Sequence, residues 1–218
     1  MRILALCCLA ACGGSDVAVD AACEPSIVYL NRTGGDYVHG GRDNASLNQS
    51  ALVDAPMTLA AWPHDDIDWR SLVDCITTAL APFPVAVTEI DPEMTTHLEL
   101  VFTTTYWAGS AGTTMIVPDA CRPGHQVEFV FGSALPTYAR ACQVALVGLA
   151  EMRAQLSLGD DCRDFVNNEQ DCAPTRTFLD QAVTCVDAAN QTTPCRCGNG
   201  ETTENTYRAM AAAFPRCP

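Results

Sequence analysis

The residues with the clearest chemistry lie near the start of the chain and end at Cys12. The sequence Leu-Ala-Ala-Cys at residues 9–12 follows Arg2 and a short apolar run, which is the pattern of a lipobox. The apolar run has about half of the roughly 20 residues that a membrane-spanning helix needs, so it is typical of a cleaved signal peptide. The pattern predicts removal of residues 1–11 and acylation of the Cys12 thiol, which anchors the chain in a membrane.

The other cysteines predict a disulfide framework. Cleavage removes Cys7 and Cys8 and acylation uses Cys12, which leaves ten of the thirteen cysteines. An even number of cysteines in an exported chain indicates disulfides, and the sequence leaves their pairing open. The ten are Cys23, Cys75, Cys121, Cys142, Cys162, Cys172, Cys185, Cys195, Cys197 and Cys217.

Two of these cysteines, Cys195 and Cys197, flank a single arginine. Closely spaced thiols can act as a redox pair when their pKa values are lowered. In an exported chain with an even cysteine count, we instead expect each of them to form a separate structural bridge. Cys23 and Cys217 lie at the two ends of the expected domain and are candidates to join them.

Acidic and amide side chains are concentrated between residues 160 and 171. Their oxygens could bind calcium, which accepts six to eight such ligands. The spacing matches no calcium-binding loop, so the sequence favours a solvated acidic loop. The residues are Asp160, Asp161, Asp164, Asn167, Asn168, Glu169 and Asp171.

The histidines and one loop serine give weaker signals. His64 precedes two aspartates, which the start of a helix explains more simply than a metal site does. His39, His97 and His125 are isolated in the sequence. Ser110 lacks the glycine two residues before it that a nucleophile elbow requires, so we expect a loop there.

The chain is strongly acidic. Without residues 1–11 it has 11 arginines, no lysine and 26 acidic residues, a net charge of −15. Such a charge repels nucleic acid and anionic lipid surfaces, so we expect no nucleic-acid partner. Residues 12–22 are predicted to be the lipidated cysteine and a flexible tether, because they are small and acidic. Residues 23–218 are long enough for a single folded domain.

The elements that must position these residues follow from apolar patterns, beginning with the strands. Short apolar runs bounded by turn residues predict strands at 27–30, 85–90, 97–104 and 127–131. A further run at 113–117 predicts a short edge strand.

The helices follow from apolar stripes with helical spacing. Residues 65–81 and 136–158 predict the two main helices, and shorter helices are expected at 177–186 and 204–214. Residues 36–62 are expected to be loop-rich. This order predicts an α/β fold (α+β) with a mixed sheet, two main helices and a disulfide-rich C-terminal part. The stripes are Trp69, Leu72, Val73, Ile76 and Leu80 in the first main helix, and Ala145, Leu149, Met152 and Leu156 in the second.

Several short segments add a resemblance to a known family. They are Ile-Val-Tyr-Leu-Asn at 27–31, Asp-Cys at 74–75 running into Ala-Pro-Phe at 81–83, Glu-Ile-Asp-Pro at 89–92, Phe-Val-Phe at 129–131 and Pro-Cys-Arg-Cys-Gly at 194–198. In their order and spacing the chain resembles secreted bacterial metzincin-like zinc peptidases over most of residues 27–214. The resemblance implies a metzincin-like mixed sheet, an active-site helix at 136–158 and a cleft edged by residues 113–117.

Zinc chemistry in that family depends on His-Glu-x-x-His in the active-site helix, followed by a glycine and a third ligand. When the motif is aligned so that its glutamate falls on Glu151, alanine stands at both histidine positions of the helix and serine stands at the glycine position. Alanine removes a zinc ligand outright, so the resemblance implies a degenerate member with no metal and no cofactor. The corresponding positions are Ala150, Glu151, Ala154, Ser157 and Asp160.

The register is sterically reasonable, because residues 150, 154 and 157 lie roughly 100° around the helix from the core stripe. Glu151 is then either an ordinary solvated helix acid or a relic of catalysis. No histidine follows His125, and no methionine lies between Met152 and Met210 to form a Met turn.

We therefore expect a lipid-anchored cell-envelope protein and a pseudoenzyme that binds an extended peptide or a protein. The expected contacts are residues 113–117 and the helix face at Ala150, Glu151 and Ala154. Gly13 follows the lipidated cysteine where many lipoproteins of the inner membrane have aspartate, which favours the outer membrane.

Two alternatives stay open. One is an active zinc metallopeptidase with unusual ligands, drawn from Glu151, Asp160 or Asp164 together with His125. The other is a purely structural surface protein whose likeness to peptidases is accidental.

Overall fold

The computed structural model describes residues 25–107, 110, 114–115, 126–154, 156–167, 175–197 and 200–214. The predicted signal peptide, Cys12 and the tether lie outside these residues. So do His125 and four of the ten cysteines, namely Cys23, Cys121, Cys172 and Cys217.

A five-stranded mixed sheet forms the centre of the molecule, with the strand order β5-β1-β6-β8-β7. The four parallel strands are β1 (Ser26–Asn31), β5 (Val85–Thr88), β6 (Leu98–Thr103) and β8 (Val127–Phe131). The short strand β7 (Thr114–Met115) lies at the edge and pairs antiparallel with β8. The predicted α/β fold with a mixed sheet is therefore confirmed.

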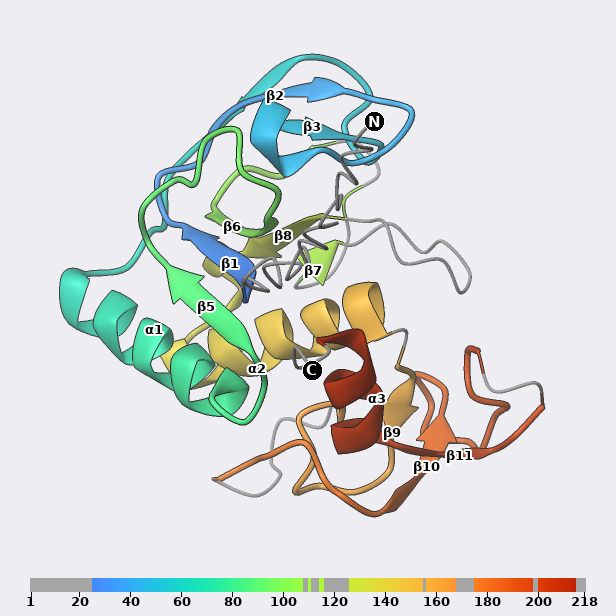
Figure 1. Cartoon of the computed structure of the whole chain (residues 1–218). Helices are drawn as coiled ribbons and strands as arrows, with labels where there is room; N and C mark the ends of the chain where they lie inside the picture. The colour runs from blue at the N-terminus through green and yellow to red at the C-terminus, as the bar shows by residue number, and fades with distance from the viewer. Residues whose placement is uncertain are drawn as a thin grey trace, which may run out of the picture.

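Two helices cover one face of this sheet (Figure 1), and both begin at a capping side chain. Helix α1 (Asp66–Leu80) starts at Asp65, whose carboxylate accepts hydrogen bonds from two backbone amides of the first turn. Helix α2 (Tyr138–Leu149) starts at Thr137, whose hydroxyl accepts from the Arg140 amide. Both predicted apolar stripes face the core, and a Cys75–Cys142 disulfide joins the two helices.

Helix α2 ends earlier than the sequence predicts. The chain continues as one π-helical turn, η3 (Ala150–Ala154), and reaches strand β9 (Leu158–Gly159) soon afterwards. The Ala150 carbonyl accepts a hydrogen bond from the Leu156 amide at 3.3 Å, six residues further on. The wider turn keeps Met152 and Leu156 of the predicted stripe in the core and leaves Glu151 only partly buried.

The other face of the sheet is covered by residues that were expected to form loops. They are loop-rich, as predicted, but the loops connect three short strands with the order β3-β2-β4 and a short 3-10 helix, which were not predicted. Few of their side chains are buried, chiefly Tyr37, Val53 and Leu59, which explains why no apolar pattern marked them. The elements are β2 (Gly35–His39), η1 (Ala45–Leu47), β3 (Gln49–Ser50) and β4 (Met57–Leu59).

The C-terminal part contains a three-stranded antiparallel sheet of β9, β10 (Ala182–Val186) and β11 (Thr203–Asn205), followed by α3 (Thr206–Ala213). The last helix was predicted, but the helix expected at 177–186 is wrong. Val183, Cys185 and Val186 are buried there, and the alternation of the first two is that of a strand. Met210 and Phe214 join the core formed by the two main helices.

Among the described residues, no helix is long and apolar enough to cross a membrane.

Candidate functional site

The two alanines of the degenerate motif do not line an open helix face. Ala150 is fully buried in the main core, and Ala154 packs against the same core. The expectation that Ala150 contacts a ligand is therefore wrong. Helix α2 is buried on every side over residues 141–149, so no exposed helix face remains beside the core stripe at Ala150.

Glu151 is the one motif residue that keeps a carboxylate in this turn, and it is mostly buried. Its side chain is 17% exposed and forms an ion pair with Arg196, with 3.3 Å between Glu151 Oε2 and Arg196 Nη2. Burial raises the pKa of Glu151, and the nearby guanidinium opposes that shift. Glu151 is therefore a partly buried, ion-paired acid rather than a freely solvated one.

Ser157 connects the turn to the C-terminal part through two hydrogen bonds. Its hydroxyl accepts from the Arg196 amide at 2.7 Å, and its own amide donates to Glu204 Oε1 at 2.7 Å. Burial, together with the negative charges of Asp164 and Glu151, raises the pKa of Glu204 to about 7. The sequence therefore pointed to Glu151 and Ser157, whereas their partners Arg196 and Glu204 were missed.

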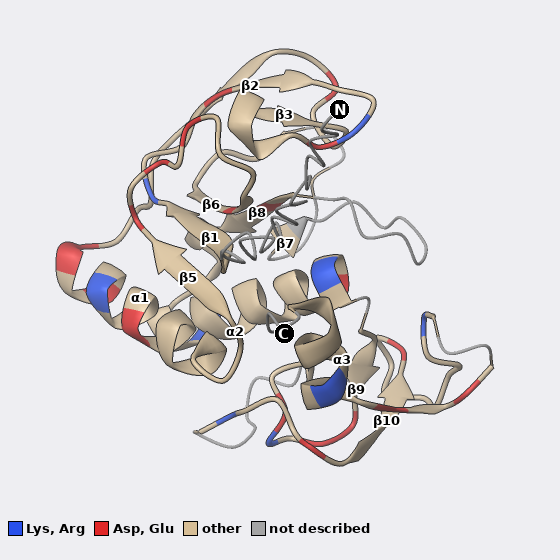
Figure 2. Ribbon diagram, in the orientation of Figure 1, with Lys and Arg blue, Asp and Glu red and all other residues tan. Residues whose placement is uncertain are grey.

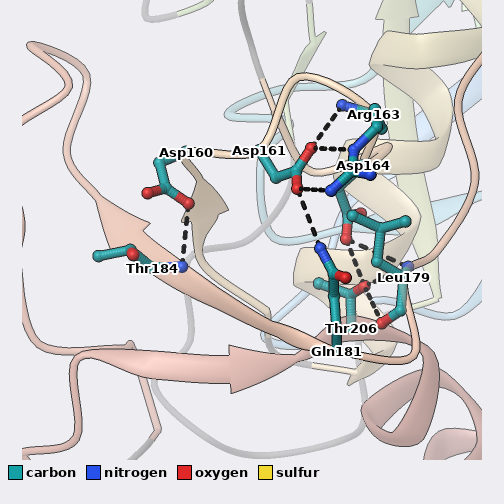
Figure 3. A network of polar contacts seen from close by, with 8 residues as sticks. All are labelled: Asp160, Asp161, Arg163, Asp164, Leu179, Gln181, Thr184 and Thr206. Atoms are coloured by element: carbon teal, nitrogen blue, oxygen red, sulfur yellow. Dashed lines mark hydrogen bonds and ion pairs between the residues drawn. The ribbon is translucent and has the colours of Figure 1, made fainter.

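Asp160, which the resemblance places at the third zinc ligand, is exposed, and its side chain faces Thr184 of β10 (Figure 3). Its carboxylate accepts a hydrogen bond from the Thr184 amide at 3.0 Å and so ties β9 to β10. Asp164 is buried and accepts from the Thr206 hydroxyl at 2.5 Å and the Leu179 amide at 3.2 Å. Both acids are thus engaged in holding the C-terminal part together.

Figure 3 also shows why the acidic loop is not organised around calcium in its described part. Asp161 binds Arg163 through both carboxylate oxygens, and this hydrogen bonding lowers the pKa of Asp161 to about 2. Asp160, Asp161 and Asp164 each face a different protein partner, so their oxygens do not converge on one point. Asn168, Glu169 and Asp171 lie outside the described residues.

Glu128 on β8 is a further buried carboxylate near the motif, and the sequence analysis missed it. It is fully buried beside Gly148 of α2, where a side chain would overlap the Glu128 carboxylate. The Thr114 hydroxyl of β7 donates to Glu128 Oε1 at 2.8 Å, and Oε2 has no hydrogen-bond partner among the described residues. Burial, with a contribution from Glu151, raises the pKa of Glu128 well above its usual value.

Glu128, Glu151, Ser157, Arg196 and Glu204 are called the carboxylate cluster below. The cluster draws on β8, the π-helical turn after α2, and the C-terminal part. Thr114 of the edge strand β7 contacts it through Glu128. One signal for Glu128 was present in the sequence, namely a single acid within the apolar strand Val127–Phe131.

Both cysteines beside Arg196 are oxidised, as predicted. Cys195 is bonded to Cys185, and Cys197 is also disulfide-bonded, so the two belong to separate bridges. Cys185, Cys195 and Glu204 come close enough to resemble a metal site, but the disulfide consumes both thiols. Cys162 is disulfide-bonded as well.

The remaining sequence candidates have local structural roles. His39, His64 and His97 each contact a backbone carbonyl within 3.2 Å, and the His64 ring also lies against Trp62 at the start of α1. Ser110 exchanges hydrogen bonds with the Trp107 backbone in a loop.

A groove of about 700 Å³ lies elsewhere, between α1, the first turn of α2 and residues 175–177. None of the motif positions lines it. Gln143 and Arg176 of its lining both donate to the Asn167 carbonyl, so these side chains fix the neighbouring chain.

No protein-family model, curated protein or solved structure matches this chain. The structure and the sequence are therefore the basis for any assignment of function.

Proposed function

We propose that this protein is a lipid-anchored component of the bacterial cell envelope, with a degenerate metallopeptidase-like domain that binds an extended peptide or protein segment without cleaving it. The proposed anchor is Cys12, and residues 12–22 serve as the tether. Gly13 after the lipidated cysteine supports the outer membrane as the location.

The ion pair between Glu151 and Arg196 is the observation that carries the non-catalytic part of the proposal. In a zinc peptidase the motif glutamate takes a proton from a metal-bound water. Here the corresponding carboxylate faces a guanidinium at 3.3 Å. A cation fixed at this place opposes a metal ion electrostatically and removes the carboxylate from proton transfer.

The edge strand supports the binding part of the proposal. Strand β7 pairs with β8 on one side, and no strand pairs with its other side among the described residues. Such an edge can bind an extended chain through backbone hydrogen bonds without any metal. Acidic residues lie on α1, on the loops around β2 and β3 and in the C-terminal part (Figure 2), and the net charge of −15 for the mature chain favours ligands that are neutral or basic.

The alternative zinc peptidase gains no support from its candidate ligands. Glu151 is paired with Arg196, while Asp160 and Asp164 hold backbone and hydroxyl donors of the C-terminal part. Each would have to leave its present partner to bind zinc. His125 lies outside the described residues.

Proline substitutions in β7 test peptide binding directly. Strand β7 pairs with β8 at Thr114–Val130 and Met115–Phe129. In an antiparallel pair such positions alternate, so one of the two β7 residues exchanges backbone hydrogen bonds with β8 and the other directs its backbone groups outward. We expect the variant whose backbone N–H points outward to stay folded and to lose at least tenfold in affinity for peptides selected on an array of short synthetic peptides. If this variant is Thr114→Pro, its melting temperature should match that of Thr114→Val, which also lacks the hydroxyl donor to Glu128.

Binding that persists in both β7 variants, in chains that circular dichroism shows to be folded, would exclude capture at this edge. The proposal would also be contradicted if array peptides bound the wild type only in proportion to their positive charge, irrespective of their sequence, when compared at the same salt concentration.

A further inference from the structure

Arg196 is held in place more firmly than a surface arginine. Its neighbours Cys195 and Cys197 are both disulfide-bonded, so the chain is anchored covalently on either side. Its amide donates to the Ser157 hydroxyl at 2.7 Å, and its guanidinium lies 3.3 Å from Glu151. Backbone and side chain are thus both directed at the end of α2.

The surroundings of the guanidinium hold an excess of negative charge. The charge of Glu151 raises the pKa of both Glu128 and Glu204, and the charge of Arg196 opposes the rise in the pKa of Glu151 and of Glu204. Behind Glu151, Glu128 is fully buried and has one carboxylate oxygen with no hydrogen-bond partner in the described part of the chain. Buried acids of this kind require a proton or a cation.

We propose that Glu151 and Glu204, backed by Glu128, form a binding site for a guanidinium group, and that Arg196 occupies this site in cis as a tethered ligand. The proposal concerns the occupant of the carboxylate cluster and does not depend on peptide binding at β7. It extends the proposed function by naming the cation that takes the place of a metal.

A guanidinium suits these ligands better than a metal ion does. Its planar, delocalised charge is weakly hydrated and carries five donors, so it is well suited to partly buried carboxylates. Hard cations need six or more oxygens around one point. Glu204 Oε1 is already engaged by the Ser157 amide, which leaves too few oxygens in the cluster for such a cation.

An exposed ion pair of the same chain provides a contrast to the pair of Arg196 and Glu151. The pair Arg208–Asp180 has 3.1 Å between its atoms, but its side chains are 77% and 59% exposed. The side chains of Arg196 and Glu151 are 35% and 17% exposed. Water can replace Arg208 when it is removed, whereas the loss of Arg196 leaves desolvated carboxylates without their cation.

Chemical rescue tests the proposal on the mature chain with its disulfides intact. We expect Arg196→Ala to melt several degrees below the wild type. Guanidinium chloride at low millimolar concentration should restore the melting temperature saturably relative to sodium chloride. Arg208→Ala is the matched control and should show neither a comparable loss nor recovery.

Several results would overturn the proposal. They are the absence of saturable recovery, equal recovery of Arg208→Ala, or recovery with calcium chloride in place of guanidinium. If Arg196→Ala does not fold, Arg196→Lys keeps the charge and loses the forked donors. The loss in melting temperature that Arg196→Lys causes should be smaller in a Glu151→Gln background than in the wild type. Equal losses in the two backgrounds would contradict the assignment of Glu151 to the guanidinium site.

Discussion

Two regions of this molecule bury carboxylates, and they stabilise them by different means. Above the main sheet, Glu99 of β6 accepts hydrogen bonds from the Tyr37 hydroxyl at 2.7 Å and from the side-chain amide of Asn31 at 2.9 Å. Below it, the carboxylate cluster places Glu151 against the guanidinium of Arg196. The first network is built from neutral donors, whereas the second contains a cation supplied by the C-terminal part.

Under the proposed function the two regions have different roles, one in stability alone and the other beside the proposed binding edge. The network of Glu99 lies wholly between the central sheet and the small sheet, and neutral donors with a proton are sufficient there. The carboxylate cluster lies instead where β8, the end of α2 and the C-terminal part meet, next to the edge strand. A fixed cation at that junction keeps several acids close together beside a surface that can bind a chain.

The largest expected effect concerns pH, because both regions contain acids with raised pKa values. Burial raises the pKa of Glu99, and of Glu204 in the cluster, to about 7 from an ordinary 4.5. The folded state therefore binds protons more tightly than the unfolded state. The stabilisation is fully present below pH 4.5 and is lost as the pH rises through 7, by roughly 3 kcal/mol at most for Glu99.

Urea unfolding between pH 4.5 and 8 measures this loss, and Glu99→Gln separates the two regions. The variant should lose the Glu99 share of the pH dependence and keep the share of the cluster. A stability that rises with pH in this window, or a slope that Glu99→Gln leaves unchanged, would contradict the assignment of raised pKa values.

The next effect comes from the contact between Gly148 and Glu128. Gly148→Ala places a methyl group where the Glu128 carboxylate lies, so the helix or the strand must move. We expect a loss of about 2 kcal/mol in the free energy of unfolding, against the gain that alanine normally brings to a helix.

The double variant Gly148→Ala, Glu128→Ala provides the control, since removal of the carboxylate creates the space that the methyl group needs. The two substitutions should therefore be less than additive when their unfolding free energies are compared. Strict additivity would mean that the contact does not exist in solution.

The smallest effect concerns single donors in the two regions. Thr114→Val removes the one hydrogen bond that Glu128 accepts in the described structure, whereas Tyr37→Phe leaves Glu99 with the Asn31 amide. We expect each to cost about 1 kcal/mol in chemical unfolding, with the larger loss in Thr114→Val. A larger loss of unfolding free energy in Tyr37→Phe than in Thr114→Val would show that Glu128 has a further hydrogen-bond donor.

Much of the fold was accessible from the sequence because it depends on apolar periodicity. Trp69, Leu72 and Ile76 mark α1, and the largely apolar run of β8, interrupted only by Glu128, marks a strand buried on both faces. The small sheet was missed because only one residue of β2, Tyr37, is buried, which leaves no alternation to detect.

The candidate site was accessible only in part. Glu151 and Ser157 followed from the spacing of a motif, but spacing could not show that α2 is buried on every side, which places Ala150 in the core. Arg196 and Glu204 come from distant positions in the chain and join the cluster through disulfides and strand pairing. No local pattern in the sequence encodes such a contact.

The most direct test of the central claim is the zinc content and peptidase activity of the mature chain, purified oxidised and without chelator. Elemental mass spectrometry should find no stoichiometric zinc in folded protein, and the peptides that bind it should be recovered intact. About one zinc per chain, lost on chelation together with peptide cleavage, would contradict the account and would return Glu151 to a catalytic role.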